Sequence, residues 1–229
     1  MDLKRLLKKW LMMNYFKLFF SKNSILRDFQ NYEFNKHKIY GKCIEFGASE
    51  NYKKNFLKYN KKIKVCHFSN YKNKSKKIIA IDLEQNNKKN LNTRYDNAII
   101  FNVLEHLNNI DVPLKNINYI LKKNGKIFGS TPFLYRVHGA PKDHFRFTRE
   151  SLLTNLKKNG FNKIIIKELG TGPFLASFSL LRGYFKYLPI IYEIFLIFAL
   201  LVDWVLKIFV KTDLKSIYPI GYIFLAKKK

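Results

Sequence analysis

The chain has 229 residues, enough for one domain with elaborations or at most two small domains. Hydrophobic residues make up 47% of the sequence, which excludes a disordered chain and allows a sizeable core. Lys and Arg outnumber Asp and Glu by 43 to 16, a formal charge of +27 that indicates either an anionic partner or a codon bias toward Lys, Asn, Ile, Phe and Tyr. No RNA-binding signature accompanies the charge, so we expect a membrane surface rather than a nucleic acid as the anionic partner.

The first residues have the pattern of a basic amphipathic helix. One face carries Leu3, Leu6, Leu7, Trp10 and Leu11, and most of the basic residues lie off it. Such a helix lies in a membrane interface or packs on the domain, and the pattern allows both. The segment lacks a small-residue cleavage site, so we expect no signal peptide. We assign residues 1–38 to this helical segment and residues 39–229 to the main domain.

From residue 41 to 168, apolar strand-like runs alternate with helix-like stretches. The expected strands are Lys42–Phe46, Ile63–His67, Lys77–Ile81, Asn97–Phe101, Lys126–Ser130 and Lys163–Lys167. The expected helices are Tyr52–Tyr59, Val112–Lys123 and Arg149–Lys158, the last with Thr148 as its cap and Gly160 after its end. Continuous apolar runs such as AII and KIII suit a sheet covered on both faces. The alternation predicts an α/β fold with an open, mostly parallel sheet.

After Gly172 the sequence becomes apolar and aromatic. Residues 189–210 are long enough to span a bilayer, but Glu193 and Asp203 interrupt them, and a strand-like stretch at 220–226 must return to the sheet. A re-entrant hairpin, an interfacial helix and a helix that covers the domain stay open. Basic flanks favour an anionic leaflet, namely Arg182, Lys186, Lys207 and Lys211. We assign 174–212 to an apolar helical insertion and 219–227 to a last strand.

The two cysteines, Cys43 and Cys66, both lie in expected strands. They form no CxxC pair, and no metal-ligand spacing occurs in the sequence, so we expect buried thiols, a reducing compartment and no metal site.

Polar residues occur where the expected strands end, which is where ligands bind in an open parallel sheet. IEFGAS places Glu45 at the end of the first strand and Gly47 just after it. Ser49 and Tyr52 stand where a dinucleotide fingerprint needs glycines, so this stretch alone is more typical of a plain turn than of a nucleotide-binding loop. IDLE ends the third strand. FNVLEHL (101–107) ends the fourth strand, and its Glu–His pair is of a kind that is normally solvated or locally hydrogen-bonded.

The loop after the fifth strand is unusually rich in titratable and aromatic residues. It reads STPFLYRVHGAPKDHFRFT (130–148) and contains His138, Asp143, His144 and Arg146. A loop of this composition is rarely only a connector.

Taken in order, IEFGAS, DLE, DNAIIFNVLEHLNN, LKKNGKIFGSTPF and HGAPKDHFRFT resemble class I S-adenosylmethionine-dependent methyltransferases. They are most similar to the type 11 group found among surface-polysaccharide biosynthesis genes. The resemblance covers residues 40–170 and the terminal PIGYIFLAKK. It implies a Rossmann-like seven-stranded sheet with an antiparallel last strand, and S-adenosylmethionine as cofactor along its carboxyl edge.

The resemblance also implies residue roles. Glu45 matches the acidic residue that holds the methionine amino group, and Gly47 matches the glycine that lets the donor approach. Ser49 stands where a second glycine is usual, and the carboxylate that normally binds the ribose is missing near Ser69 and Asn70.

The remaining donor contacts implied by the resemblance lie after the third and fourth strands. Asp82 and Leu83 match the pair beside the adenine, whereas Phe101 and Asn102 match the strand end that lines the methionine moiety.

For the chemistry, the activated methyl group needs mainly an acceptor aligned with it at roughly 3–3.5 Å. An oxygen acceptor also has to lose its proton, so we expect His138 to act as the base, with Asp143 as its orienting group or as the base itself. Arg146 is expected to grip an anionic acceptor. The alternative is that all three residues only stabilise the loop, through a His–Asp contact and an arginine bound to a backbone carbonyl.

We therefore expect a methyltransferase of the cytoplasmic side of the inner membrane, peripheral on it, whose acceptor is a small molecule, a sugar or a lipid-linked glycan. An inactive methyltransferase-like interaction protein and an RNA methyltransferase are the two alternatives. The acceptor and the oligomeric state do not follow from the sequence.

Overall fold

The computed structural model describes Leu18, Ser21 and residues 23–47, 63–69, 78–79, 82–85, 94–139, 142–185 and 187–229, with the backbone alone for 63–69 and 78–79. The expected helix Tyr52–Tyr59, the residue Ser49 and the amphipathic pattern over residues 3–11 lie outside these ranges, so they stay predictions, as does the division at residue 38.

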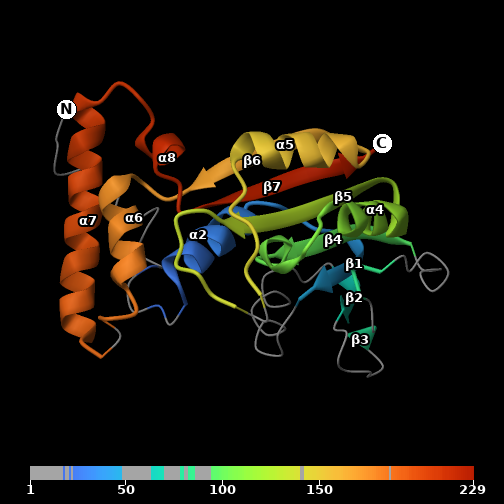
Figure 1. Ribbon diagram of the computed structural model, residues 1–229, viewed down its shortest axis with the longest axis horizontal. Coiled ribbons are helices and arrows are strands. Elements are labelled where there is room, and N and C mark those ends of the chain that lie inside the picture. The colour runs from blue at the N-terminus through green and yellow to red at the C-terminus, as the bar shows by residue number, and fades with distance from the viewer. Residues whose placement is uncertain are drawn as a thin grey trace. The chain divides into compact units, whose positions relative to one another are not determined.

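The helices and strands follow the alternation that the sequence predicts (Figure 1). In chain order they are α2 (Ile25–Phe34), β1 (Gly41–Phe46), β2 (Ile63–Ser69), β3 (Ile78–Ile79), β4 (Tyr95–Phe101), the 3-10 turn η3 (Leu104–His106), α4 (Asp111–Ile120), β5 (Leu121–Pro132), α5 (Arg149–Lys158), β6 (Phe161–Leu169), α6 (Pro173–Leu181), α7 (Pro189–Phe209), α8 (Leu214–Ile217) and β7 (Gly221–Lys228).

The chain divides into two compact units. The sheet unit comprises Phe34–Glu168 and Gly221–Lys229, and the helical unit comprises Met1–Glu33 and Leu169–Ile220. The candidate site lies in the sheet unit, and the long apolar helix belongs to the helical unit.

The strands form one sheet in the order β3-β2-β1-β4-β5-β7-β6. The pairs β1–β2, β1–β4, β2–β3 and β4–β5 are parallel, and β7 runs antiparallel to β5, with Phe128 opposite Leu225. The predicted α/β class with a mostly parallel sheet is confirmed. The order changes direction at β1 and β4, so the carboxyl ends of these two strands form the edge where such folds bind ligands.

A hydrophobic core packs α4 and α5 against the sheet. It contains Leu114, Ile117 and Ile120 of α4, Leu152 and Leu156 of α5, and Ile100, Ile127, Phe161 and Phe224 of the strands. Phe128, the neighbour of Ile127 in β5, points to the other face because side chains alternate along a strand. There its ring meets those of Phe34 and His37, with centroids 5.5 and 5.6 Å away.

Helix α5 is confirmed, together with the residues predicted at its start and after its end. Thr148 accepts a hydrogen bond from the Ser151 backbone N–H through its Oγ1 (3.2 Å), and Gly160 follows the helix with φ +82°. The Thr148 bond satisfies one of the amide groups that a helix start leaves without an internal partner.

Two predictions are wrong, one about a helix end and one about the coverage of a strand. The helix expected over Val112–Lys123 ends at Ile120, because Leu121 pairs with Tyr95 and begins the long strand β5. The KIII run of β6 is not covered on both faces, since Ile165 is 51% exposed whereas Ile166 is buried. Strand β6 is at the end of the sheet order, which explains why one of its faces meets solvent.

In the helical unit, α6 and α7 pack against each other through buried residues such as Leu175, Phe178, Leu196 and Leu200. Helix α7 is long and apolar enough to cross a membrane by length and composition. Only 28% of its most apolar stretch is buried, unlike the core helix of a soluble protein, which is mostly buried. Its Asp203, an interruption in the sequence pattern, is 2% exposed. The carboxylate accepts hydrogen bonds from Thr171 Oγ1 (2.6 Å) and from the N–H groups of Phe174 (2.9 Å) and Leu175 (3.1 Å).

Candidate functional site

Glu45 and Gly47 lie at the carboxyl end of β1, as predicted. Glu45 is 2% exposed and faces Ile99 of β4 in the strand register. Gly47 follows the strand with φ +70°, and a Cβ added there would collide with the Val103 side chain. A glycine is therefore required twice over, for its backbone conformation and for the close approach of the segment after β4.

Asp82 and Leu83 lie in a short turn that Asn116 of α4 fixes to the core. The Asn116 side-chain amide donates to the carbonyl oxygens of Leu83 (3.0 Å) and Gln85 (2.7 Å). Leu83 is 7% exposed, whereas the Asp82 side chain is exposed and accepts from the Glu84 N–H (2.9 Å). The turn therefore holds a buried leucine next to an exposed carboxylate.

Phe101 and Asn102 end β4. Asn102 takes a positive φ of 53°, and its N–H donates to the Ser130 carbonyl (2.9 Å) while its Oδ1 accepts from Ser130 Oγ (3.1 Å). Positive φ is uncommon for a residue with a side chain, although asparagine tolerates it best. The two bonds to Ser130 of β5 therefore hold this turn in place, and the chain continues from it into η3.

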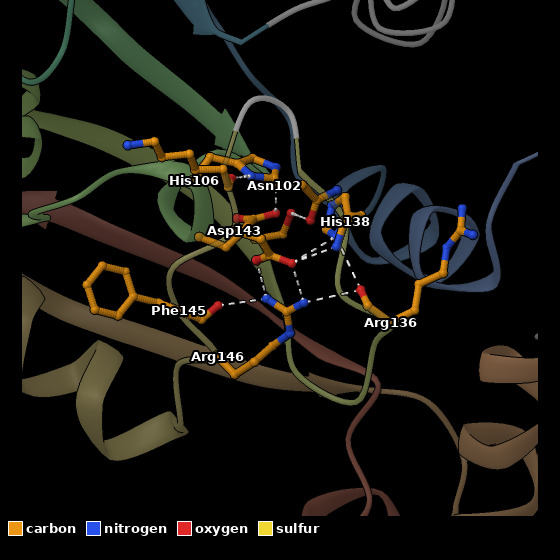
Figure 2. Close-up of polar contacts among 10 residues, drawn as sticks. Asn102, His106, Arg136, His138, Asp143, Phe145 and Arg146 are labelled. Atoms are coloured by element: carbon orange, nitrogen blue, oxygen red, sulfur yellow. Dashed lines mark hydrogen bonds and ion pairs between the residues drawn. The ribbon is translucent and has the colours of Figure 1, made fainter.

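The loop that follows β5 is organised around Asp143 (Figure 2). Its carboxylate is only 3% exposed and binds the Arg146 guanidinium with both oxygens, at 2.5 and 2.7 Å. It also accepts a hydrogen bond from the His138 N–H (2.8 Å), and the His138 Nδ1 lies 3.4 Å from Oδ2. These bonds hold the pKa of Asp143 well below its usual range, chiefly through Arg146, so the group stays ionised.

Arg146 is engaged within the loop. Besides Asp143, its guanidinium donates to the carbonyl oxygens of Phe145 (2.9 Å) and Arg136 (3.2 Å). This arrangement fits a residue that fixes the loop better than one that reaches an anionic acceptor.

Glu105 and His106 join this loop to the end of β4. The Glu105 carbonyl accepts from the N–H groups of His144 (2.7 Å) and Phe145 (3.2 Å), and His106 Nδ1 lies 2.5 Å from the Lys142 carbonyl oxygen. The His106 and His138 rings pack edge to face with centroids 5.0 Å apart. The structure thus brings His138, Asp143 and Arg146 together beside the β4 end, as the sequence predicts.

The expectation of a solvated or locally hydrogen-bonded Glu105–His106 pair is wrong for Glu105. Its side chain is fully buried, and neither carboxylate oxygen has a hydrogen-bond partner among the described residues. Burial raises its pKa to about 8. The sequence could not show this, because the residues that cover Glu105 arrive from a loop nearly forty positions later.

His138 has the electrostatics of a proton acceptor. Burial lowers the pKa of its imidazole, and the opposing effect of the Asp143 carboxylate does not reverse this, so the ring is neutral near pH 7. Its side chain is still 31% exposed. A neutral, accessible imidazole on a rigid carboxylate–guanidinium support is able to take a proton from a hydroxyl group.

The chain is similar to known proteins over most of its length. A family described as a methyltransferase domain matches residues 25–165, more than half of the chain. No match is found among curated proteins. Among solved structures, a SAM dependent methyltransferase from Archaeoglobus fulgidus is similar over 99% of this chain and 100% of its own, with TM-score 0.57 and 14% identity.

Two further structures contain the donor or its product. Phosphoethanolamine N-methyltransferase 2 from Haemonchus contortus, in complex with S-adenosyl-L-methionine, has TM-score 0.53 and 15% identity over 100% of this chain and 60% of its own. The N-methyltransferase NodS from Bradyrhizobium japonicum WM9, in complex with S-adenosyl-l-homocysteine, has TM-score 0.51 and 9% identity over 99% of this chain and 97% of its own. At these identities the likeness is one of fold.

Proposed function

Because the chain belongs to the family of methyltransferase domains, enzymes whose donor is S-adenosylmethionine, we propose that it methylates an oxygen of a sugar or of a lipid-linked glycan. One observation carries the choice of an oxygen acceptor. A neutral His138, supported by Asp143 and Arg146, lies beside the β4 end, and a hydroxyl acceptor needs such a group to lose its proton.

The donor is proposed to bind across the carboxyl ends of β1 and β4. Glu45 holds the methionine amino group, and Gly47 lets the donor approach the backbone. Ser49, which stands where a second glycine is usual, belongs to the same cofactor-binding turn. The conformation of Gly47 supports this role, because it keeps the turn after β1 free of a side chain.

At the other end of the donor, Asp82 and Leu83 lie beside the adenine, and Phe101 with Asn102 lines the methionine moiety. Support comes from the Asn116 bonds that fix the Asp82–Leu83 turn and from the Ser130 bonds that fix Asn102.

The three loop residues are proposed to act as a unit. His138 assists removal of the acceptor proton, Asp143 fixes its backbone and ring, and Arg146 holds Asp143. The methyl group needs no further activation, since it leaves a positively charged sulfur. The enzyme therefore contributes mainly alignment and proton removal.

The enzyme is proposed to work on the cytoplasmic side of the inner membrane, attached peripherally. Helix α7 supports this location. Its exposed apolar residues include Ile190, Ile194, Phe198, Ile208 and Phe209, and a soluble surface rarely carries so many on one element. A lipid-linked glycan acceptor would be presented at the same surface.

Calorimetric titration with S-adenosylmethionine and S-adenosylhomocysteine tests the donor site. We expect binding in the micromolar range for the wild-type protein, with losses of more than about tenfold in Asp82→Ala and Gly47→Val. Glu150→Ala, which removes an exposed carboxylate from α5, should bind like the wild type. Absence of binding by folded protein would refute the proposal. Donor binding followed by transfer to amines but not to sugar hydroxyls would refute the oxygen acceptor alone.

A further inference from the structure

The carboxylate of Glu105 is an unusual feature of the site. It is fully buried, and neither oxygen has a hydrogen-bond partner among the described residues. A buried polar group without such a partner has lost its hydrogen bonds to water without replacing them, which destabilises the fold, the more so when the group is charged. A group of this kind points to a ligand that the protein chain itself does not supply.

Two imidazoles face the same point. Glu105, His106 and His138 each offer one ligand atom, and these atoms lie within 4.8 Å of one another. Of these atoms, Glu105 Oε1 and His106 Nε2 lie 3.8 Å apart. Two bonds to one cation of about 2.1 Å each span at most ~4.2 Å, so a small inward movement brings all three atoms to coordinating distance.

The opposite nitrogen of each ring is already held. His106 Nδ1 lies 2.5 Å from the Lys142 carbonyl, and His138 Nδ1 lies 3.3 Å from the Arg136 carbonyl and 3.4 Å from the Asp143 carboxylate. A backbone carbonyl or carboxylate on one ring nitrogen fixes the tautomer and leaves Nε2 as the ligand atom, the usual support of a metal-bound histidine.

We propose that Glu105, His106 and His138 bind a divalent first-row transition ion such as Zn²⁺ or Mn²⁺. Two imidazoles and one carboxylate form a ligand set for such ions, and three protein ligands leave coordination positions open. The sequence concealed the set because two ligands are adjacent and the third comes from another loop.

The role of the ion rests on the proposed function. An acceptor hydroxyl that occupies an open position has a lowered pKa, and its proton passes to water. The oxygen lone pair then forms the new C–O bond, while the electrons of the methyl–sulfur bond stay on sulfur, and neutral S-adenosylhomocysteine leaves. His138 thus assists proton removal as a ligand of the ion rather than as the group that receives the proton.

Cobalt binding tests the site without any acceptor. Tag-free protein is stripped with a chelator and titrated with Co²⁺, and the visible absorption of the ion reports nitrogen and oxygen ligation. We expect saturation at one ion per chain in the wild type. Glu105→Gln and His138→Ala should weaken binding by more than about tenfold. His144→Ala, an exposed histidine of the same loop outside the cluster, is the matched control and should bind like the wild type.

No saturable absorption from folded wild-type protein would overturn the inference, as would equal affinity in the wild type, Glu105→Gln and His138→Ala. Circular dichroism checks that the buried substitution folds, and the partly exposed His138 provides a second variant if it does not. Calorimetry with S-adenosylmethionine on the chelated protein separates the two proposals. Donor binding without Co²⁺ binding refutes only the metal site, and Co²⁺ binding without donor binding refutes only the methyltransferase proposal.

Discussion

The Asp111 carboxylate shows how much of the packing in the sheet unit depends on one side chain. It lies in the first turn of α4 and accepts from Lys158 Nζ (2.5 Å) and Asn159 Nδ2 (3.0 Å) at the end of α5. The two helices that cover the core are therefore joined at opposite polarity, a carboxylate at a helix start and an ammonium at a helix end, which both macrodipoles favour.

This contact makes the stability depend on pH. Lys158 and Asn159 lower the pKa of Asp111 in the folded chain, so its contribution is complete above the unfolded value of about 3.9 and is lost as the pH falls through the lower, folded value. We expect Asp111→Asn to reduce the free energy of unfolding at pH 7 by about 0.5–1 kcal/mol, a small value because the pair is partly exposed. Urea unfolding at pH 7 and near pH 3 measures it.

Glu150→Gln removes an exposed first-turn carboxylate from α5 and controls for the loss of a helix-start charge. A deficit in Asp111→Asn that stays constant down to pH 3 would contradict the argument.

The individual residues of the site were predictable to different degrees. His138, Asp143 and Arg146 stood out because one short loop carried them all, and the structure joins them. Glu105 and His106 did not stand out, because an adjacent Glu–His pair after a strand is usually at the surface. The burial of Glu105 accompanies main-chain bonds between it and the residues His144 and Phe145, which no local pattern encodes.

At the scale of elements, a side chain of α7 caps the start of α6. Its own cap position is Gly172, which has no side chain, and Asp203 supplies the missing acceptor for the first amide groups. Asp203 thus acts as the cap of α6 across a helix–helix contact. In the sequence it counted only as an interruption of an apolar run.

We expect Asp203→Ala to lower the stability of the helical unit by about 2–3 kcal/mol, because three donors lose a charged acceptor in a buried place. Trp204 is the next residue along α7, so tryptophan fluorescence during urea unfolding is a suitable readout. Asp213→Ala, an exposed carboxylate of the same unit, should change it by less than about 0.5 kcal/mol. Equal stability of both variants would mean that the α6 cap is dispensable.

Element boundaries followed the sequence where local signals agreed with the tertiary contacts. Helix α5 matched residue for residue because its cap, dipole charge and terminal glycine all act locally. Helix α4 was predicted too long, and β5 too short, because pairing of Leu121 with Tyr95 overrides the helical pattern.

For the molecule as a whole, the surface of α7 leads to a testable prediction that the protein attaches to membranes. Ile194 and Phe198 are 59% and 54% exposed on the apolar helix, with basic Lys207 and Lys211 exposed near its end. We expect sedimentation with vesicles that contain phosphatidylserine, weaker binding to phosphatidylcholine alone, and weakening by salt. The variant Ile194→Asp/Phe198→Asp should bind more than about tenfold less, since burial of each side chain is worth about 1.5–3 kcal/mol.

Ile165→Asp, on an exposed isoleucine of β6 in the sheet unit, is the control and should bind like the wild type. If the double variant sedimented as strongly as the wild type, α7 would not be the attachment surface. Equal binding to both kinds of vesicle, insensitive to salt, would exclude an anionic leaflet as the attraction.

The strand order has a consequence for how the protein is made. Strand β6 takes its place in the sheet beside β7, yet the ribosome produces residues 170–220 between them. At about 5–20 residues per second this interval lasts on the order of 3–10 seconds. During it, β6 has no partner strand, β5 has a free edge, and the apolar α7 emerges before the sheet is complete. The nascent chain is therefore most exposed to aggregation, and most open to capture by a chaperone or a bilayer, just before β7 is synthesised.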